Sequence, residues 1–532
     1  AAVRIVADAA SSCSSTPPVV PACPSRPPRS PSNRSPRRVS FDSRRFVCER
    51  VDVGVARRYE IEPRELGIGG YGKVYLAKDH VFKDRLVAIK KVNKRNAYVG
   101  EAEEDEENQL ESLLREVEIM KDLDHPCICR LFETYAEGEY MFFVMEYCAG
   151  GDLFDRFMRS GTIAERLVAE ITSQVASALK YAHGRGIAHR DLKLENICFV
   201  NRDPRACHVK VIDWGLGRYF GASRMKSNVG SMTFSAPEVL NHEAGNDGYT
   251  SACDIWSLGV IAYVVLCGRP PFSGSVREQL QQMRREQFSM DGPAWAQISS
   301  GAADFVRAVL RNDTRDRASL DTLLRTPWLT AGRHAGLDTQ DVASVLRRVE
   351  RFRQTSDFFS LCAASVARQG DHSTLEGLGE IFCMLDRNCD GVLDLEELRD
   401  GFRSSFGDAS DLVHEVEDIF MHLDLDGTGR ITYTEFCAAA LDENSYRTQH
   451  MLWAAFKTFD IRDDGQISLE ELQQVLKNAD VKQVRKVAQE VASREVAQEV
   501  MEEFGNSDGN ISFQEWLLLM QEHACLKATR AQ

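Results

Sequence analysis

Residues 189–196, HRDLKLEN, carry a carboxylate, an ammonium and an amide at the spacing that phosphoryl transfer uses. Asp191 can accept the proton of a substrate hydroxyl, Lys193 can neutralise a γ-phosphate, and Asn196 can hold a magnesium ion. Asp213, in the triplet DWG, can supply a second magnesium contact. Because four such residues rarely coincide in this order by chance, the sequence predicts an enzyme that transfers the γ-phosphate of ATP.

A glycine-rich segment upstream can bind the phosphates of the nucleotide. Its pattern, GxGxxGxV, lets backbone amides approach phosphates without obstruction by side chains. Lys90 ends the motif VAIK on a predicted strand, where its ammonium can hold the α- and β-phosphates. This order of glycines and lysine excludes a dinucleotide-binding site. The predicted nucleotide-binding residues of the segment are Gly67, Ile68, Gly69, Gly70, Tyr71, Gly72 and Val74.

Glu116, in LLREVEIM, lies on a predicted helix between that lysine and the catalytic loop. Its carboxylate can pair with Lys90 and so fix the ammonium against the phosphates. A surface glutamate without a catalytic role is the alternative. We favour the pair over one with Glu118, because Glu118 points well away from the apolar positions Val117 and Met120.

These motifs resemble those of eukaryotic protein kinases over residues 59–329. The resemblance extends to APE at 236–238, to Asp254 in DIWSLG and to Arg317, and it implies that Arg317 pairs with Glu238. It also implies a bilobal domain with a small β-rich N-lobe and a helical C-lobe. The chain departs from the family at Trp214, where the usual DFG has phenylalanine. This change keeps the magnesium ligand but leaves open how the site switches between active and inactive states.

Segment 144–157, VMEYCAGGDLFDRF, resembles the connection between the two lobes of a kinase, where adenine binds. The resemblance implies that Met145 limits the back of the adenine pocket. It further implies that Glu146 and Cys148 offer backbone hydrogen bonds to adenine, and that Asp152 contacts ribose or substrate.

The charges around the catalytic loop indicate the substrate class. Asp152 and Glu195 match kinase positions that contact ribose or substrate arginines, so protein substrates whose Ser or Thr lies near basic residues are a reasonable expectation. Lys193 within the catalytic loop is typical of Ser/Thr specificity. Ser227 has the usual activation-loop phosphorylation position, where Arg190 could bind its phosphate. A plain loop serine is an equal alternative.

Two acidic segments match the calcium loop of an EF-hand, which needs oxygen ligands at positions 1, 3, 5, 7, 9 and 12 and glycine at position 6. They are residues 386–397 (loop 1) and 424–435 (loop 2), and position 7 contributes a backbone oxygen. The predicted ligands are Asp386, Asn388, Asp390, Val392, Asp394 and Glu397 in loop 1, and Asp424, Asp426, Thr428, Arg430, Thr432 and Glu435 in loop 2.

Two further segments match the pattern less well. Residues 460–471 (loop 3) place Arg462 where a ligand oxygen belongs, so we expect a lower calcium affinity. Residues 504–515 (loop 4) begin with Phe504, so we favour a structural partner over a calcium site. The starting positions of the four loops fit four helix-loop-helix units. The predicted ligands of loop 3 are Asp460, Asp464, Gln466, Ser468 and Glu471.

The elements that position these residues can be read from composition and periodicity. Residues 1–58 are rich in proline, serine and arginine and are predicted to be disordered. Short β-type segments follow to about residue 98, and helical periodicity dominates from residue 111. Between them residues 101–107 contain six acidic side chains and read as a solvated insertion. The predicted fold class is therefore α+β.

A basic amphipathic helix is predicted after the kinase-like part. The apolar residues of 341–352 fall on one stripe with arginines beside it. The order of kinase (59–329), junction helix (335–370) and all-α domain with four EF-hands (371–525) resembles the calcium-dependent protein kinases of plants and apicomplexan parasites. That resemblance implies ATP, Mg²⁺ and Ca²⁺ as cofactors. It also implies that the junction helix obstructs the substrate region until calcium opens the EF-hand lobes, whose apolar grooves then bind it.

Composition bounds the remaining possibilities. The chain of 532 residues is too long for one hydrophobic core, and its net charge of −15 is concentrated after residue 371. The 15 cysteines have no regular spacing, so reduced thiols are expected. We expect a cytoplasmic monomer that binds no nucleic acid and has no membrane span. Membrane association is left open, because the sequence begins without Met and an acylation signal could precede it.

Three alternatives remain at this point: a calcium-binding scaffold without catalysis, a kinase that recruits separate calmodulin through its junction helix, and a constitutive kinase whose tail only buffers calcium. The intact residues Lys90, Asp191, Asn196 and Asp213 argue against the first. The attached EF-hands make the second unnecessary. A phosphorylation assay with calcium present or chelated, without calmodulin, separates all three from the calcium-activated kinase.

Overall fold

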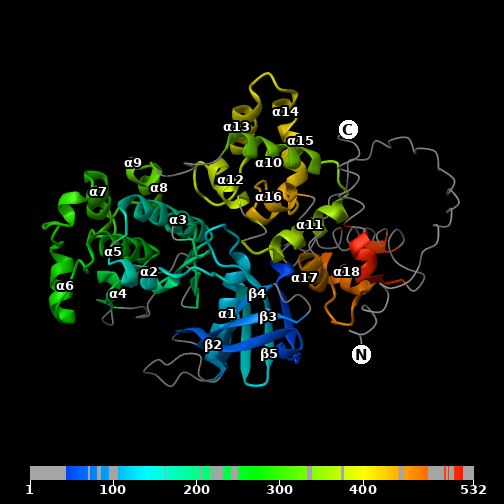
Figure 1. Cartoon of the computed structure of the whole chain (residues 1–532), viewed down its shortest axis with the longest axis horizontal. Helices are drawn as coiled ribbons and strands as arrows, with labels where there is room; N and C mark the ends of the chain where they lie inside the picture. The colour runs from blue at the N-terminus through cyan, green and yellow to red at the C-terminus, as the bar shows by residue number, and fades with distance from the viewer. Residues whose placement is uncertain are drawn as a thin grey trace. The chain divides into compact units, whose positions relative to one another are not determined.

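The computed structural model gives secondary structure from Ser43 onward (Figure 1). All described residues belong to one unit, Val39–Gln532. The structure describes residues 43–69, 72–80, 85–94, 106–161, 163–203, 207–215, 218–219, 232–240, 250–331, 338–372, 375, 377–442, 449–476, 497–498, 501, 509–518 and 520.

A six-stranded sheet forms the N-lobe, in the order β1-β5-β6-β4-β3-β2. Its alternating and β-branched sequences, such as LVAIKKVN, favour half-buried strands. The β3–β4 register sets Val74 opposite Lys90, and helix α1 (Glu106–Asp122) carries Glu116. The strands are β1 (Cys48–Val51), β2 (Tyr59–Gly69), β3 (Gly72–Asp79), β4 (Leu86–Asn93), β5 (Leu131–Glu137) and β6 (Tyr140–Glu146).

The start of the described chain differs from the prediction. Residues 43–58 are not disordered: they form the 3₁₀ turns η3 (Ser43–Phe46) and η4 (Val55–Arg57), and strand β1 pairs in parallel with β5. The reason is long-range, because Phe46 is fully buried and Arg50 forms a buried ion pair with Glu133. Residues 43–58 therefore do not belong to the predicted disordered segment, and residues 1–42 of that prediction lie outside the described residues. In the acidic run 101–107, the last two residues begin helix α1.

Helices dominate the C-lobe. Helix α5 is apolar on nearly all sides and almost entirely buried, and Gly268 ends it in the left-handed conformation. None of the described helices combines the length and the apolar character of a membrane span. The helices are α2 (Leu153–Ser160), α3 (Glu165–Gly184), α4 (Pro237–Leu240), α5 (Ala252–Cys267), α6 (Val276–Arg284), α7 (Ser300–Val309), α8 (Leu320–Leu324) and α9 (Pro327–Thr330).

Short strands and turns of the C-lobe frame the catalytic loop. Strands β9 and β10 pair antiparallel, β7 joins β9, and β8 pairs with β11. These elements are β7 (Gly151–Asp152), β8 (Ile187–Ala188), η5 (Leu194–Asn196), β9 (Ile197–Phe199), β10 (Val209–Val211), β11 (Arg218–Tyr219) and η6 (Trp295–Gln297).

The junction is two helices rather than the single predicted one. Helix α10 (Thr339–Phe352) ends before a short break, and Ser356 caps helix α11 (Asp357–Gln369) by accepting the N–H of Phe359. A serine at this position favours a new helix start over continuation of the first. Both helices lie in the same apolar core as the EF-hand helices.

The region after residue 377 consists of helix-loop-helix units. In the first pair, Leu393 and Ile431 form an antiparallel bridge between the loops. In the second, β12 (Gln466–Ile467) pairs with β13 (Ile511–Ser512), so the described part of this region is helical apart from these short ladders and the loops. The helices are α12 (Leu378–Leu385), α13 (Leu395–Phe406), α14 (Asp411–His414), α15 (Val416–Leu423), α16 (Tyr433–Ala440), α17 (Gln449–Phe459) and α18 (Leu469–Leu476).

The fold is α+β, as predicted: a β-rich lobe, a helical lobe and a helical EF-hand region. The twelve described cysteines are free thiols.

Candidate functional site

One buried carboxylate fixes the backbone of the catalytic loop by accepting two hydrogen bonds. Asp254, in α5, accepts the N–H groups of His189 and Arg190 at 2.9 and 2.8 Å. Arg190 adopts a positive φ of 72°, which these two hydrogen bonds stabilise. Sequence motifs pointed to Asp254 but not to this role. The loop geometry therefore depends on a residue that lies more than sixty positions further along the chain.

Three predicted catalytic residues lie together at this loop. Lys193 Nζ is 2.6 Å from Asp191 Oδ2, and Asn196 donates its amide N–H to the carbonyl of Asp191 at 2.8 Å. Ile212, which precedes Asp213, donates its N–H to the carbonyl of Asn196 at 2.9 Å. The predicted magnesium residues Asn196 and Asp213 therefore belong to adjacent, hydrogen-bonded segments.

The ion pair predicted between Lys90 and Glu116 is present. Lys90 Nζ lies 2.7 Å from Glu116 Oε1 and 2.9 Å from Asp213 Oδ1, and Lys90 and Glu116 are both buried. Burial alone would lower the pKa of Lys90, but the carboxylates of Asp213 and Glu116 raise it well above its ordinary value. Glu118 instead pairs on the surface with Lys121. The site therefore holds a charged ammonium between two carboxylates.

The glycine-rich segment lies at the turn between β2 and β3. Gly67, Ile68 and Gly69 end β2, Gly72 and Val74 begin β3, and Gly70 and Tyr71 lie outside the described residues. A Cβ atom on Gly72 would lie 2.3 Å from the carbonyl oxygen of Lys91, so only glycine fits this close approach of two strands.

The connection between the lobes contains a buried ion pair that the sequence did not reveal. Glu146, at the end of β6, lies 2.9 Å from Lys210 Nζ, and its N–H donates to the carbonyl of Arg130. Met145 and Cys148, on either side of it, are half-buried. Asp152 caps α2 by accepting the N–H of Asp155 at 2.7 Å.

Two further expectations from the kinase motifs concern the activation segment. Arg317 forms a two-pronged pair with Glu238, at 2.7 and 3.1 Å, as predicted. Trp214 is fully buried, and its ring lies 4.7 Å from that of His189. The larger ring is therefore accommodated in the interior behind the catalytic loop. Ser227 lies outside the described residues.

Loop 1 folds around its own carboxylates. Asp386 accepts the N–H groups of Asp390 and Gly391, and Glu397 accepts that of Asn388. Burial raises the pKa of Asp386 to about 7 despite the hydrogen bond from Gly391. These carboxylates are therefore poorly solvated in the absence of a cation. Asp394 caps α13 by accepting the N–H of Glu397.

The outer turn of loop 1 lies against the kinase-like part. Lys180, in α3, donates to the carbonyl of Asn388, and Cys389 and Val392 belong to the main kinase core. Gly391 has a φ of 79°, and a Cβ there would lie 2.3 Å from the ring of Tyr181. The first calcium loop and the helical lobe therefore share a tight contact.

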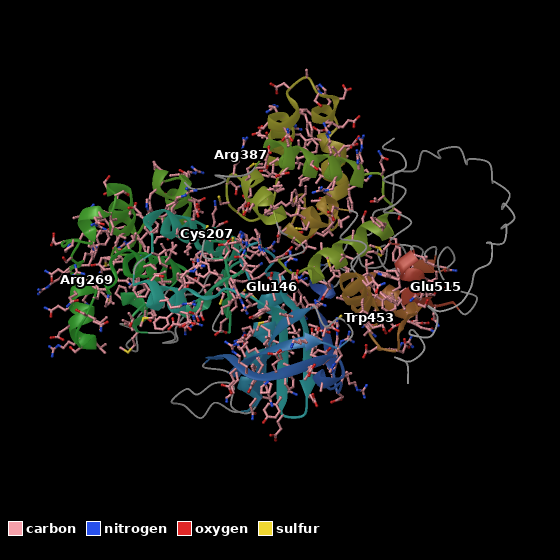
Figure 2. The ribbon with its side chains drawn as sticks, in the orientation of Figure 1. Glu146, Cys207, Arg269, Arg387, Trp453 and Glu515 are labelled. Atoms are coloured by element: carbon pink, nitrogen blue, oxygen red, sulfur yellow. The ribbon has the colours of Figure 1, made fainter. Side chains whose placement is uncertain are left out.

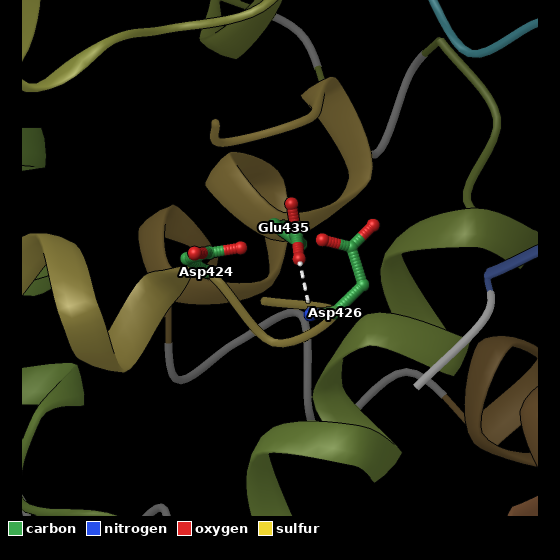
Figure 3. A group of neighbouring side chains, drawn as sticks. All are labelled: Asp424, Asp426 and Glu435. Atoms are coloured by element: carbon green, nitrogen blue, oxygen red, sulfur yellow. Dashed lines mark hydrogen bonds between the residues drawn. The ribbon is translucent and has the colours of Figure 1, made fainter. Parts of the chain in front are cut away.

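Loop 2 gathers three carboxylates (Figure 3). Ligand oxygens of Asp424, Asp426 and Glu435 lie within 4.8 Å of one another, and Glu435 accepts the N–H of Asp426. Burial and the charge of Asp426 raise the pKa of Glu435 to about 8. Among the described residues this group alone has the spacing of a metal cluster.

The remaining predicted ligands of loop 2 also lie at the loop. Thr428 donates its N–H to Asp424, and Thr432 caps α16 by accepting the N–H of Glu435. Arg430 was predicted to offer its carbonyl, which accepts the Thr428 hydroxyl. Its side chain extends to loop 1, where it pairs with Asp390 at 2.8 Å. This salt bridge therefore joins the two loops in addition to the antiparallel β-bridge between Leu393 and Ile431.

Loop 3 has the EF-hand path with different electrostatics. Asp460 accepts the N–H groups of Asp464 and Gly465, as Asp386 and Asp424 accept the corresponding N–H groups in loops 1 and 2. Lys457, however, lies 2.6 Å from Asp460, and Arg462 lies 3.2 Å from Glu471. Burial alone would raise the pKa of Glu471, but hydrogen bonds from Arg462 and Ser468 lower it. Of the other predicted ligands, Gln466 lies in β12 and Ser468 donates its hydroxyl to Glu471.

Loop 4 keeps its second half. Gly509 has a φ of 76°, Ile511 pairs with Ile467, and Glu515 accepts the N–H of Ser512 at 2.7 Å. Phe504, at position 1, lies outside the described residues. The described half fits a structural partner of loop 3.

Comparisons with known proteins cover both parts of the chain. Residues 60–329 match the protein kinase domain, 375–441 an EF-hand domain pair and 454–476 an EF hand. Calcium-dependent protein kinase 3 of Plasmodium berghei is 32% identical over 87% of this chain and 80% of its own length. Calcium-dependent protein kinase 17 of Arabidopsis thaliana is 31% identical over 86% of this chain and 83% of its own length.

The chain belongs to the calcium-dependent protein kinase family. It is a serine/threonine protein kinase that uses ATP and Mg²⁺ and has EF-hands that bind Ca²⁺. Its substrates are proteins.

The donor set of this calcium-dependent protein kinase fits a magnesium ion beside the catalytic loop. Asp213 offers a carboxylate, and Asn196 offers an amide oxygen, which are the hard ligands that Mg²⁺ takes. Burial alone would raise the pKa of Asp213, but the Lys90 ammonium lowers it, so the carboxylate is ionised. Magnesium bound there would neutralise charge on the β- and γ-phosphates.

Loops 1 and 2 of the kinase fit calcium, and in loop 3 cationic side chains lie beside the predicted ligands. In loops 1 and 2, oxygen ligands surround a turn closed by glycine at position 6, with φ of 79° and 77°. The pKa values of Asp386 and Glu397 in loop 1 and of Asp426 and Glu435 in loop 2 are raised, so a divalent cation would relieve the desolvation and mutual repulsion of these carboxylates. In loop 3 the carboxylates at positions 1 and 12 already pair with Lys457 and Arg462. Calcium ligation by loop 3 therefore stays a prediction, with the lower affinity expected from Arg462 at position 3.

Sequence reasoning missed several residues that shape these sites. Lys210, the side-chain pairing of Arg430 and the loop-holding role of Asp254 depend on distant partners, which no local pattern marks. Lys457 could have been found, because it stands three residues before Asp460 on one predicted helix, and such pairs lie on the same face.

Proposed function

We propose that calcium bound at loops 1 and 2 activates this kinase by holding the junction helices in the EF-hand region, away from the substrate cleft. Without calcium, the junction helices would obstruct that cleft. The observation that carries the proposal is the burial of the apolar stripe of α10 in the EF-hand core. The stripe residues are Val342, Val345, Leu346, Val349 and Phe352.

The basic residues of α10 add polar contacts to the same partner. Arg348 donates to the carbonyl of Ala440 at the end of α16, where cations are favourable. Arg353 pairs with Glu415 at the start of α15. A basic amphipathic helix in an acidic, apolar groove is a recurrent mode of recognition by calcium sensors. These contacts support capture of the junction by the first EF-hand pair.

The end of α11 supports an active arrangement of the N-lobe. Arg368 is buried, lies 3.2 Å from Asp124 and donates to the carbonyls of Lys121 and Leu123. These residues end and follow α1, which carries Glu116. Captured in this way, α11 would brace α1 while Glu116 pairs with Lys90.

The proposed roles in phosphoryl transfer follow from the geometry of the loop. Asp191 accepts the proton of the substrate hydroxyl, and Lys193, 2.6 Å away, pairs with that carboxylate and neutralises the transferred phosphoryl group. Lys90 holds the nucleotide phosphates, with Glu116 fixing its position. Asn196 and Asp213 hold magnesium, and Met145, Glu146 and Cys148 border the adenine.

Acidic residues at the start of α2 support a basic substrate context. Asp152 and Asp155 lie within one turn, and Glu195 belongs to the catalytic loop. Burial raises the pKa of Asp152, and the charges of Asp155 and Glu195 raise it further. An arginine of the substrate would relieve this repulsion. Arg156 and Arg159 on α2 are the competing local cations.

One assay tests the proposed function. The full chain, ATP–Mg²⁺ and an arginine-containing serine peptide are incubated with calcium or with a chelator, without calmodulin. We expect activity to rise at about 10⁻⁷ to 10⁻⁵ M free calcium, the range of EF-hand sensors. The Asp191→Asn variant should be inactive at every calcium level.

Other outcomes identify the alternatives. Equal rates with calcium and chelator would reject the switch and leave a constitutive kinase. A requirement for added calmodulin would favour an external sensor, and retained activity in Asp191→Asn would reject the catalytic assignment. An acidic peptide used equally well would reject the basic substrate context. A cytoplasmic monomer remains part of the proposal, and light scattering after size-exclusion chromatography tests the monomer.

A further inference from the structure

In the second EF-hand pair, cationic side chains of the chain itself lie beside the carboxylates of loop 3. The described parts of this pair are residues 449–476 and 509–518, and beside it lies the amino-terminal strap, residues 43–51. We propose that loop 3 is a calcium-independent anchor: cationic side chains of the chain take the place of the ion, and the anchored loop holds the strap at every calcium level. The inference rests on the proposed switch and assigns its sensing to loops 1 and 2.

Lys457 places a positive charge against the first carboxylate of loop 3. Its Nζ lies 2.6 Å from Asp460 Oδ2 and 2.5 Å from Asp463 Oδ1. The lysine is buried and Asp460 is fully buried, so the pair is little screened by solvent. The corresponding positions of loops 1 and 2 are Cys383 and Met421, which carry no charge. Only loop 3 therefore has this resident cation among the described loops.

Arg462 changes position 3 of loop 3 from a ligand into a second cation. Loops 1 and 2 have the oxygen-bearing Asn388 and Asp426 at this position. In loop 3 the Arg462 N–H donates to Glu471 at 2.9 Å, and its guanidinium lies 3.2 Å from the same carboxylate. The arginine is largely exposed, so its energy contribution is small. Its main effect is that position 3 offers no side-chain oxygen.

Loop 3 is nevertheless folded as a calcium loop. Asp460 accepts the N–H groups of Asp464 and Gly465 at 3.0 and 2.9 Å, which matches the contacts of Asp424 in loop 2. Ile467 pairs with Ile511 of loop 4. Trp453 lies 4.8 Å from Phe513 between ring centroids, and Figure 2 labels Trp453 and Glu515 in this pair. Loop 3 thus keeps the shape of a calcium loop through hydrogen bonds to Asp460, strand pairing with loop 4 and ring contacts.

The strap is bound directly to this loop. Arg50 Nη2 and Cys48 Sγ both donate to the carbonyl of Lys457, at 3.2 and 3.4 Å. Arg50 Nη1 also lies 3.8 Å from Asp463. Phe46 is buried in the EF-hand core with its ring 6.0 Å from that of Phe459. The backbone of the lysine that neutralises loop 3 is therefore the point to which the strap binds.

The other edge of the strap belongs to the kinase N-lobe. Strand β1 pairs with β5, and Arg50 Nε donates to Glu133 at 3.1 Å. The strap therefore connects the N-lobe sheet to loop 3 without a calcium ligand on the path. On this basis the first EF-hand pair responds to the calcium concentration, and the second keeps the EF-hand region attached to the N-lobe when calcium is low.

Two measurements on the full chain test the inference. Native mass spectrometry with excess calcium should count two bound calcium ions. Hydrogen exchange should show the strap and residues 454–471 equally protected, within about twofold, with calcium and with chelator, while α10 changes. Three or four bound ions, or loss of strap protection on chelation, would overturn the anchor. No calcium uptake at all would overturn the proposed switch itself.

A charge-swapped variant provides the positive test. Lys457→Met combined with Arg462→Asp removes both cations and restores an oxygen at position 3. We expect it to bind a third calcium ion and to make strap protection calcium-dependent. The control Arg387→Asp makes the same arginine-to-aspartate change at a non-ligand position of loop 1 and should still bind two ions. Only two ions in the folded double variant would overturn the proposal. Should it fail to fold, the ion count and exchange of the unaltered chain still decide.

Discussion

At the scale of single residues, the N-lobe depends on a buried cluster of charges around Glu133. Its carboxylate lies 3.1 Å from Arg50 and 3.0 Å from Arg58, and it accepts the Tyr59 hydroxyl. Burial alone would raise the pKa of Glu133, but Arg58 and Arg50 lower it to about 2. The cluster therefore joins the strap, β2 and β5 through one ionised side chain.

The first prediction concerns this carboxylate. Glu133→Gln should destabilise the N-lobe by about 3 to 5 kcal/mol at neutral pH, because two buried guanidinium groups lose their counter-charge. Scanning calorimetry should show a lower melting temperature for the variant. Glu137→Gln, an exposed change on the same strand, is the control and should have little effect. Equal melting of both variants would contradict the role of the cluster.

The same residue sets an acid dependence. Because the folded pKa, about 2, lies below the ordinary 4.5, Glu133 stabilises the fold fully above pH 4.5. That contribution, about 3 kcal/mol, is lost as the pH falls from 4.5 towards 2. The unaltered chain should therefore lose more stability on acidification over this range than Glu133→Gln does. Equal losses in calorimetric scans would contradict the lowered pKa.

Residue-scale chemistry was largely predictable where one motif contains it. Asp191, Lys193 and Asn196 are neighbours in the sequence, so their proximity follows from the loop itself. The partner of Lys90 could also be predicted, because helical position separates Glu116 from Glu118. The Glu133 cluster could not, since its arginines come from a segment whose composition indicates disorder.

At the scale of elements, the break between α10 and α11 decides how the junction works. A single straight helix could not turn its stripe into the EF-hand core and also set Arg368 beneath α1. The cap at Ser356 provides the change of direction. Periodicity showed the apolar stripe but not the break, because a helix cap inside a polar stretch resembles ordinary helix surface.

The next prediction tests how strongly the EF-hand core binds α10. Leu346→Ala removes a fully buried side chain from the stripe and should cost about 2 to 5 kcal/mol of docking energy. Because calcium would have to restore that energy, the calcium concentration for half-maximal activity should rise several-fold. Peptide phosphorylation at buffered calcium levels measures this. Leu518→Ala, an exposed leucine, is the control. An unchanged calcium requirement would contradict capture of α10 by the EF-hands.

At the scale of the whole molecule, the kinase and EF-hand parts share buried polar contacts. Asp124 accepts the N–H of Thr434 at 2.8 Å, and Arg130 donates to the carbonyls of Ala367 and Gly370. Burying such polar groups without partners costs free energy, so these contacts must form together when the two parts join and break together when they separate. The domain order was predictable from motifs in sequence. The surfaces that join the domains were not, because each contact pairs residues hundreds of positions apart.

A last prediction tests this joint. Arg368→Met leaves Asp124 without one buried partner and removes two hydrogen bonds to the end of α1. The kcat at saturating calcium should fall about tenfold or more, since a loss of 1.4 kcal/mol already corresponds to that factor. Arg399→Met, which breaks exposed pairs on α13, should retain activity. Full activity in Arg368→Met would show that α11 does not brace the N-lobe.

The contact between Gly391 and Tyr181 has a consequence for timing. If docking of loop 1 on Tyr181 raises the calcium affinity of the loop, calcium binding must favour docking by the same factor, because linkage is reciprocal. The ion in loop 1 would then leave slowly while the turn rests on the aromatic ring. Phosphorylation would then continue for some time after a brief calcium pulse has ended, and this one interface would set how long the kinase stays active.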